Sequence, residues 1–416
     1  MALLAKLKPD VTALRHSRDF RVIEIGAIVS GLGSQAALVA IPVQVYLLTG
    51  STALVGLIGA AELIPMVLVA LFGGALADRI DRRRILLAAQ AATLTGAALL
   101  AVLAFAGHPP VAAIFVLAAL LAGSSTLDSI ARSSMTARLA GEWLRSAIAF
   151  NFGMNQVTAI VGPGLSGIVI AAAGVGWVYA ADAVSVLMTV YAALTIDPQH
   201  PHAVSSEPIL ASVTAGLRFA RSSKPLIGSF VIDLFAMTFG MPRVLFAPLS
   251  LHVFHAGTAG AGFLYASVAA GAAVAALSNS WLASARWIGR ITIAMVVVWG
   301  VAIATTALTT SIVVAAILLA VAGAADSISA VCRTTIAQLV TTDEMRGRMT
   351  STFLLVVIGG ARLGDIESGM VASATTPRFS VLSGGLACLA GVGVVVAAFP
   401  GLARFDAHRY ARAAST

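Results

Sequence analysis

The sequence predicts an all-α membrane protein in which twelve transmembrane helices form two pseudo-symmetric halves of six. Three observations predict this fold class. Hydrophobic residues make up 59% of the 416 residues and charged residues only 11%, whereas a soluble domain has about 25% charged residues. The apolar residues gather in runs of the roughly 20 residues that one helix needs to cross a bilayer. Short motifs also recur at a similar spacing in the two halves of the chain.

Twelve apolar runs follow one another along the chain, with ends defined to within a few residues. They cover residues 20–48, 52–77, 85–106, 111–138, 146–172, 177–196, 226–254, 258–284, 290–309, 311–339, 349–374 and 380–400. The largest polar gap follows the sixth run and includes Ile209 to Arg221, whose helical periodicity fits a helix on the membrane surface. We therefore expect a cytoplasmic N-terminal segment, a six-helix half, a linker with a surface helix, a second half and a cytoplasmic tail. Their expected bounds are 1–19, 20–196, 197–224, 225–400 and 401–416.

The basic residues set the orientation of these runs and exclude some functions. Most of the 26 Lys and Arg residues lie in the two terminal segments and in the loops after even-numbered runs. Such loops face the cytoplasm, so both termini are expected there. The positively charged loops, which give the chain its net charge of +8, then face anionic lipid, and no nucleic-acid partner is expected. None of the three lysines follows a glycine, so the chain has no P-loop with which to hydrolyse ATP.

An internal repeat relates the two halves. Residues 51–56 resemble residues 257–262, and residues 132–135 resemble residues 333–336. The alternative is a chance match among small residues, which the similar separations of 206 and 201 residues make improbable. Parallel repeats in transporters place the substrate site near the bilayer midplane, between the halves.

The loop between the second and third runs carries a motif suited to a gate. Residues 73–84 read Gly-Gly-Ala-Leu-Ala-Asp-Arg-Ile-Asp-Arg-Arg-Arg. Small residues let helices approach closely, and an acid can cap a helix or pair with an arginine in one conformation only. A plain positively charged loop would explain the arginines but not the glycine spacing or the acid. The gating candidates are Gly74, Asp78, Arg79, Arg82 and Arg83.

This loop resembles the G-x-x-x-D-R-x-x-R-R signature of the major facilitator superfamily. The resemblance implies a secondary transporter that works by alternating access. The fifth run adds a stretch similar to the Gly-Pro motif of antiporters in this superfamily, although an ordinary packing kink would look the same. Its gating candidates are Gly162, Pro163, Gly164 and Gly167.

Charged residues inside the runs need a reason, because each costs about 2.5–3.5 kcal/mol on insertion scales. Glu62 lies alone, roughly 14 Å from the outer end of its run at about 1.5 Å per residue, and it has no partner in its own run. Asp128 and Arg132 are spaced i, i+4, and such a pair is either structural or a proton carrier. The proton-coupling candidates are Glu62, Asp128 and Asp233.

The remaining buried charges are candidates for a substrate cavity. Arg362 and Asp365 are spaced i, i+3, and Asp326 and Arg333 share a helix face. Arg243 has no counter-acid in its own run and faces either an acid from elsewhere or an anionic substrate. The cavity candidates are Arg132, Arg243, Asp326, Arg333, Arg362, Asp365 and Glu367.

Several strings resemble the enterobactin exporter branch of the proton-linked drug exporters. They are Ile41-Pro-Val-Gln-Val45, Pro242-Arg-Val-Leu245 and Gly262-Phe-Leu-Tyr-Ala266. The resemblance implies proton-coupled efflux of a small amphiphile, a siderophore or a drug. A broad multidrug efflux pump and a lysophospholipid flippase or importer are the alternatives. No cofactor, metal or enzyme activity is expected, and the protein is expected to act as a monomer in the lipid bilayer.

Overall fold

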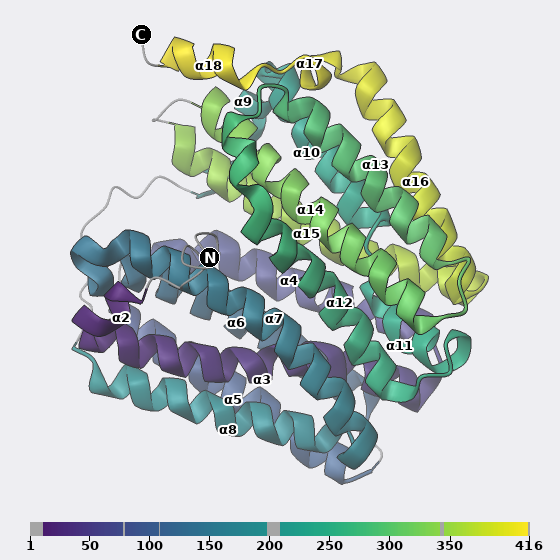
Figure 1. Cartoon of the computed structure of the whole chain (residues 1–416). Helices are drawn as coiled ribbons and strands as arrows, with labels where there is room; N and C mark the ends of the chain where they lie inside the picture. Colours follow the sequence, from purple (N-terminus) through teal and green to yellow (C-terminus); the bar gives the residue numbers. More distant parts are fainter. Residues whose placement is uncertain (1–10, 78–79, 108, 198–208, 342–344, 415–416) are drawn as a thin grey trace, which may run out of the picture. The chain divides into compact units, whose positions relative to one another are not determined.

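The computed structural model describes residues 11–77, 80–107, 109–197, 209–341 and 345–414, and every regular element among them is helical. The chain divides into two compact units (Figure 1). The first unit comprises Met1–Gln44 and Ile64–Ser206, and the second comprises Val45–Leu63 and Glu207–Thr416. The segment Val45–Leu63, which the sequence assigns to the N-terminal half, therefore packs with the C-terminal residues.

The long helices up to residue 195 agree with the first six predicted runs. They are α3 (Arg18–Thr49), α4 (Thr52–Ala77), α5 (Arg82–Phe105), α6 (Val111–Ala140), α7 (Leu144–Ala173) and α8 (Val175–Thr195). Two short elements, α2 (Thr12–His16) and η1 (Gly141–Trp143), precede α3 and α7. The divisions between the units fall inside α3 and α4, next to the helix-internal prolines Pro42 and Pro65.

The remaining elements agree with the later runs, with one difference. They are α9 (Ile209–Ser222), α10 (Lys224–Phe239), η2 (Arg243–Leu245), α11 (Phe246–Pro248), η3 (Leu249–Val253), α12 (Gly257–Ser278), η4 (Asn279–Ser284), α13 (Ile288–Thr306), α14 (Ile312–Val340), α15 (Arg346–Ala374), α16 (Pro377–Ala398), α17 (Pro400–Ala403) and α18 (Ala407–Ala414). The seventh run, expected as one continuous helix, is instead broken after α10. Pro242 explains the break, since it has no N–H to continue the helical hydrogen bonds.

Length and composition support membrane spanning. Ten stretches among the described residues are long and apolar enough to cross a bilayer. One of them, Val111–Ala173, covers both α6 and α7, and α15 is not among the ten. These stretches and the helix bounds are those of an all-α, multi-pass membrane protein.

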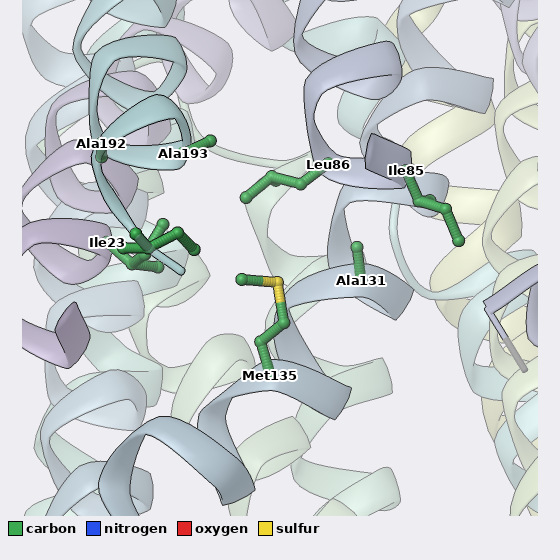
Figure 2. Packing of buried hydrophobic residues seen from close by; sticks show 8 residues of the cluster. Ile23, Ile85, Leu86, Ala131, Met135, Ala192 and Ala193 are labelled. Atoms are coloured by element: carbon green, nitrogen blue, oxygen red, sulfur yellow. The ribbon is translucent and has the colours of Figure 1, made fainter. Parts of the chain in front are cut away.

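The first unit is held together by a small apolar cluster where four helices meet. It contains Ile23 of α3, Ile85 and Leu86 of α5, Ala131 and Met135 of α6, and Ala192, Ala193 and Ile196 at the end of α8. Figure 2 shows the Met135 side chain pointing toward Leu86. Helices α5 and α8 lie side by side (Figure 1). Alanines at the contact let the helices approach closely, as membrane helix packing requires.

In the second unit, glycines set the contact between α12 and α14. A Cβ added at Gly323 would overlap the carbonyl oxygen of Val268, and one added at Gly271 would overlap the backbone of Ala320. Backbone-to-backbone approach of this kind gives dispersion contacts over a large area, which is the main attraction between helices in lipid.

The end of the chain is fastened to the segment before α13. Arg286 pairs with Asp406 at 2.8 Å, and its carbonyl accepts a hydrogen bond from the Ala407 amide at 2.9 Å. The Arg290 guanidinium donates to the Ala403 carbonyl at 3.1 Å. The hydrogen bond from Arg286 holds the pKa of the Asp406 carboxyl below its ordinary range. Because that pKa is lowered by folding, the pair stabilises this attachment at neutral pH, and the contribution is lost as the pH falls through the lowered value.

Gly323→Ala is expected to destabilise the protein by about 1–3 kcal/mol, since the new methyl group overpacks the α12–α14 contact. Thermal unfolding in detergent, followed by a thiol-reactive dye at the buried Cys332 and Cys388, measures this. Gly393→Ala is the matched control because no atom lies within 4 Å of its added Cβ. Equal melting temperatures for the two variants would contradict the packing argument.

Asp406→Asn is expected to speed amide hydrogen exchange across residues 403–410 at neutral pH, because it removes the ion pair with Arg286. The unmodified protein should lose this protection only below the ordinary carboxyl range of about pH 4. Exchange rates corrected for their intrinsic pH dependence test this. Equal protection in both proteins at pH 7 would show that the ion pair does not hold the segment.

Candidate transport site

The second unit contains a cluster of charged side chains in the middle of its helices. Its members come from five different elements. They are Glu62 of α4, Asp233 of α10, Arg243 of η2, Asp326 and Arg333 of α14, and Arg362 and Asp365 of α15. All seven are residues that the sequence singles out for proton coupling or a substrate cavity. The fold brings them together from positions as far apart as 62 and 365.

Arg362 lies between two carboxylates. Its Nη1 atom is 2.6 Å from Glu62 Oε2 and 3.1 Å from Asp365 Oδ2. Glu62 has no partner in its own run, as the sequence indicates, and it pairs instead with a residue on a helix 300 residues further along the chain. The pair of Arg362 with Asp365 follows from their i, i+3 spacing on α15.

Small residues bring α4 close enough to α15 for this contact. A Cβ added at Gly56 would lie 2.9 Å from the Cα of Gly369, and one added at Gly59 would lie 2.8 Å from the Cβ of Asp365. Both distances are shorter than real Cβ contacts, so only glycine fits. Glu62 follows one turn after Gly59, on the same face of α4.

A second arginine, Arg333, is also flanked by two acids. Its Nη2 atom lies 2.8 Å from Asp233 Oδ1 and 3.6 Å from Asp326 Oδ1. The side chains of Arg333 and Asp233 are 2% and 0% exposed, whereas Asp326 is 26% exposed. Arg333 also donates to the Ser329 hydroxyl at 2.6 Å. The contact between Asp233 of α10 and Arg333 of α14 could not be predicted from residue spacing, because the two residues lie on different helices.

The break in the seventh run lies close to the ion pairs of Arg362 and Arg333. The indole N–H of Trp299 donates to the Gly240 carbonyl at 2.7 Å, and the Tyr265 hydroxyl donates to the Arg243 carbonyl at 3.0 Å. Trp299 and Tyr265 were not predicted as site residues, since a buried aromatic residue in a span usually packs in the core. Arg243 interacts electrostatically with Asp326 and Asp365. Within the described part of the chain its side chain has no ion pair within 4 Å.

The first unit has an arginine centre of its own. Arg132 Nε pairs with Asp128 Oδ2 at 2.8 Å, as the i, i+4 spacing indicates, and its Nη2 donates to the Ser30 hydroxyl of α3 at 3.4 Å. The Gln90 amide donates to Asp128 at 2.7 Å. Arg132 also interacts electrostatically with the buried Glu24.

The two arginine centres occupy matching places in the repeat but exchange their partners. Arg132 meets a carboxylate four residues earlier on its own helix and a hydroxyl on the first helix of its half. Arg333 meets a hydroxyl, Ser329, four residues earlier and a carboxylate, Asp233, on the first helix of its half. The shorter ion pair of the arginine is therefore within one helix in the first half and between two helices in the second, where Arg333 also lies 3.6 Å from Asp326 of its own helix.

The predicted gating loop is described only in part. Gly74 lies in α4, whereas Asp78 and Arg79 lie outside the described residues. The Arg82 guanidinium donates to the Ser134 carbonyl at 3.3 Å and the Arg83 guanidinium to the Leu194 carbonyl at 2.8 Å. These arginines thus bind carbonyl groups near the C-terminal ends of α6 and α8.

The other sequence-predicted gating residues lie in α7, and Glu367 lies in α15. Gly162 packs against α3, where an added Cβ would lie 2.6 Å from Gln35 Cβ, and Pro163, Gly164 and Gly167 continue the same helix. Glu367 lies 3.5 Å from the Ser368 hydroxyl and is not part of the ion pairs described above. Among the described residues, no group of three or more His, Cys, Asp or Glu side chains is placed to hold a metal ion.

Residues 11–413 match the family described as transmembrane secretion effectors. The chain is 30% identical over 387 residues to the enterobactin exporter EntS of Citrobacter koseri, covering 91% of this chain and 92% of that protein. It is likewise 30% identical over 398 residues to EntS of Salmonella typhi, covering 92% and 94%. These relatives are named as exporters.

Solved structures share the fold. The nucleoside transporter NupG superposes with a TM-score of 0.75 at 14% identity, covering 92% of this chain and 100% of that chain. A bacterial homologue of the iron transporter ferroportin superposes with a TM-score of 0.71 at 14% identity, covering 93% and 98%. At such identities the likeness concerns the fold alone.

Asp233→Asn is expected to destabilise the protein more than Asp326→Asn. Breaking a buried ion pair from one side costs about 3–5 kcal/mol because a buried charge is left uncompensated, and only Asp233 is fully buried. Melting temperatures of the two variants in detergent provide the measurement. An equal or smaller loss for Asp233→Asn would mean that Arg333 does not depend on Asp233 for its charge balance.

Proposed function

The chain belongs to the transmembrane secretion effector family of the major facilitator superfamily, and we propose that it exports a siderophore or a related small amphiphile in exchange for protons. It is a secondary transporter that crosses the membrane several times. The enterobactin exporters that it resembles over nine-tenths of its length support a siderophore as the substrate. The coupling to protons is supported by the buried acids.

One observation carries this proposal: Glu62 and Arg362 pair at 2.6 Å across two helices that belong to different halves of the sequence. Protonation of Glu62 removes its negative charge and leaves Arg362 to Asp365 on its own helix. The contact between α4 and α15 is then weakened by one charge-assisted hydrogen bond. In the proposed cycle the pair is present in one conformation and absent in the other, so that a proton favours the conformation in which the two helices are apart.

The charge balance of the cluster supports the uptake of a single proton. Four carboxyl groups, those of Glu62, Asp233, Asp326 and Asp365, accompany three guanidinium groups. With every group ionised, the cluster carries one net negative charge in an apolar layer, where uncompensated charge is costly. Binding of one proton makes it neutral. Asp128 offers a further proton-binding carboxyl in the first half.

In the orientation that the basic loops indicate, both termini face the cytoplasm. The loop arginines, together with Asp78 and Arg79, then close the cytoplasmic side in one facing state, and the Gly162–Gly167 stretch of α7 lets that helix bend. The two halves, 20–196 and 225–400, are the parts that alternating access rearranges in this proposal. We propose that a monomer is sufficient for this cycle, because the whole cluster lies within one chain.

The proposal is tested with the full chain in proteoliposomes that carry a pH gradient and an internal pH dye. Candidate siderophores and hydrophobic drugs are added one at a time. A dye response to one siderophore, absent without protein, is the expected result. Responses to many drugs and none to siderophores would instead establish a multidrug efflux pump. No response to either group would overturn proton exchange and favour a lysophospholipid flippase or an importer.

Glu62→Gln mimics the protonated carboxyl and is expected to reduce gradient-driven export to the leak rate of vesicles without protein. The reason is that the variant cannot exchange a proton at the Arg362 contact. Glu142→Gln is the matched control, since Glu142 is exposed in η1. Normal coupling in Glu62→Gln, Asp128→Asn and Asp233→Asn alike would remove all three carboxyl groups from the coupling step.

A further inference from the structure

The broken seventh span offers a charged group that the ion pairs described above leave unused. Arg243 begins η2, directly after Pro242, where the helix α10 has ended. Broken helices in transporters commonly line the substrate site, because the freed backbone groups can bind substrate or ions. Which kind of ligand such a break can bind depends on which of its groups remain free.

The four carbonyl oxygens from Gly240 to Arg243 each accept a hydrogen bond. Gly240 accepts from Trp299 at 2.7 Å, and Arg243 accepts from Tyr265 at 3.0 Å. The Met241 carbonyl accepts from the Arg243 amide at 2.8 Å, and the Pro242 carbonyl accepts from the Leu245 amide at 3.0 Å. A cation would need such oxygens as ligands. These four oxygens already have hydrogen-bond donors within the protein.

The guanidinium of Arg243, by contrast, is free to donate. Within the described residues its side chain makes no hydrogen bond or ion pair. The two acids that act on it electrostatically, Asp326 and Asp365, are already bound by Arg333 at 3.6 Å and Arg362 at 3.1 Å. A guanidinium presents its N–H donors in a planar fork that matches two adjacent anionic oxygens.

We propose that Arg243 binds the anionic end of the exported compound through a pair of neighbouring oxygens, as in a carboxylate or a catecholate. This inference rests on the proposed export function and names the residue that selects the substrate. Arg243 lies ten residues before the end of η3 at Val253, and Glu62 lies ten residues after the start of α4 at Thr52. At about 1.5 Å per residue of α-helix, Glu62 is roughly 15 Å from its helix end.

The position of Arg243 brings a bound anion close to the acids of the cluster. An anion held by Arg243 adds negative charge near Asp326 and Asp365, on which Arg243 already acts. The cluster then carries additional negative charge. A neutral compound would supply no such charge.

Binding is measured by calorimetry on the full chain in nanodiscs without a pH gradient, so that the result does not depend on transport. The probes are 2,3-dihydroxybenzoate, which is anionic, and 2,3-dimethoxybenzamide, a neutral analogue of similar shape. The variants are Arg243→Gln, which removes the charge, and Arg243→Lys, which keeps the charge but not the fork. Arg378→Gln, at the start of α16 and bonded to the Thr309 carbonyl at 3.3 Å, is the control.

We expect Arg243→Gln to weaken binding of 2,3-dihydroxybenzoate by about tenfold or more, with a smaller loss in Arg243→Lys and none in Arg378→Gln. Binding of the neutral analogue should not change.

Unchanged affinity in Arg243→Gln, an equal loss for both probes, or no binding of the anion to the unmodified protein would overturn the inference. If Arg243→Gln does not fold, Arg243→Lys decides by the same comparison of probes. Anion binding that depends on Arg243 in a protein that moves no protons would support this inference while overturning proton exchange.

Discussion

The need to pair every charge inside an apolar layer is the constraint on which the rest of this structure depends. Desolvating one ion costs several kcal/mol, so an acid or an arginine stays charged there only beside its opposite. Arg333 and Asp233, which are 2% and 0% exposed, meet this need by binding each other. Because the two residues lie on different helices, the ion pair also fixes α10 against α14. Arg362 does the same for α4 and α15 through Glu62.

The same need for charge pairing can also allow helices to move relative to one another, depending on where the partner lies. Ion pairs within one helix, such as Asp128–Arg132, persist whatever the neighbouring helices do. Ion pairs between helices, such as Asp233–Arg333, are made or broken when those helices move. Around the equivalent arginines Arg132 and Arg333, a carboxylate and a hydroxyl have exchanged positions, so the 2.8 Å ion pair lies within one helix in the first half and between two helices in the second. The two halves therefore place the same kinds of group differently around a matching arginine.

The break after α10 follows the same logic of satisfied groups. A helix interrupted in lipid exposes polar backbone groups, and these need partners as much as a charge does. Trp299 and Tyr265 supply hydrogen bonds to two of the carbonyls at the break. Among the described residues, the side chain of Arg243 makes no hydrogen bond or ion pair.

The sequence by itself determined the spans and the pairs within helices. Run length and basic loops are local properties, and the spacings of Asp128–Arg132 and Arg362–Asp365 follow from the helical repeat alone. Tertiary structure decided the partners of Glu62 and Asp233, the capping of the break by Trp299 and Tyr265, and the grouping of Val45–Leu63 with the C-terminal residues. These depend on which faces of distant helices meet. That choice is made by close packing at small residues such as Gly56 and Gly369, and the spacing of residues along one helix carries no information about it.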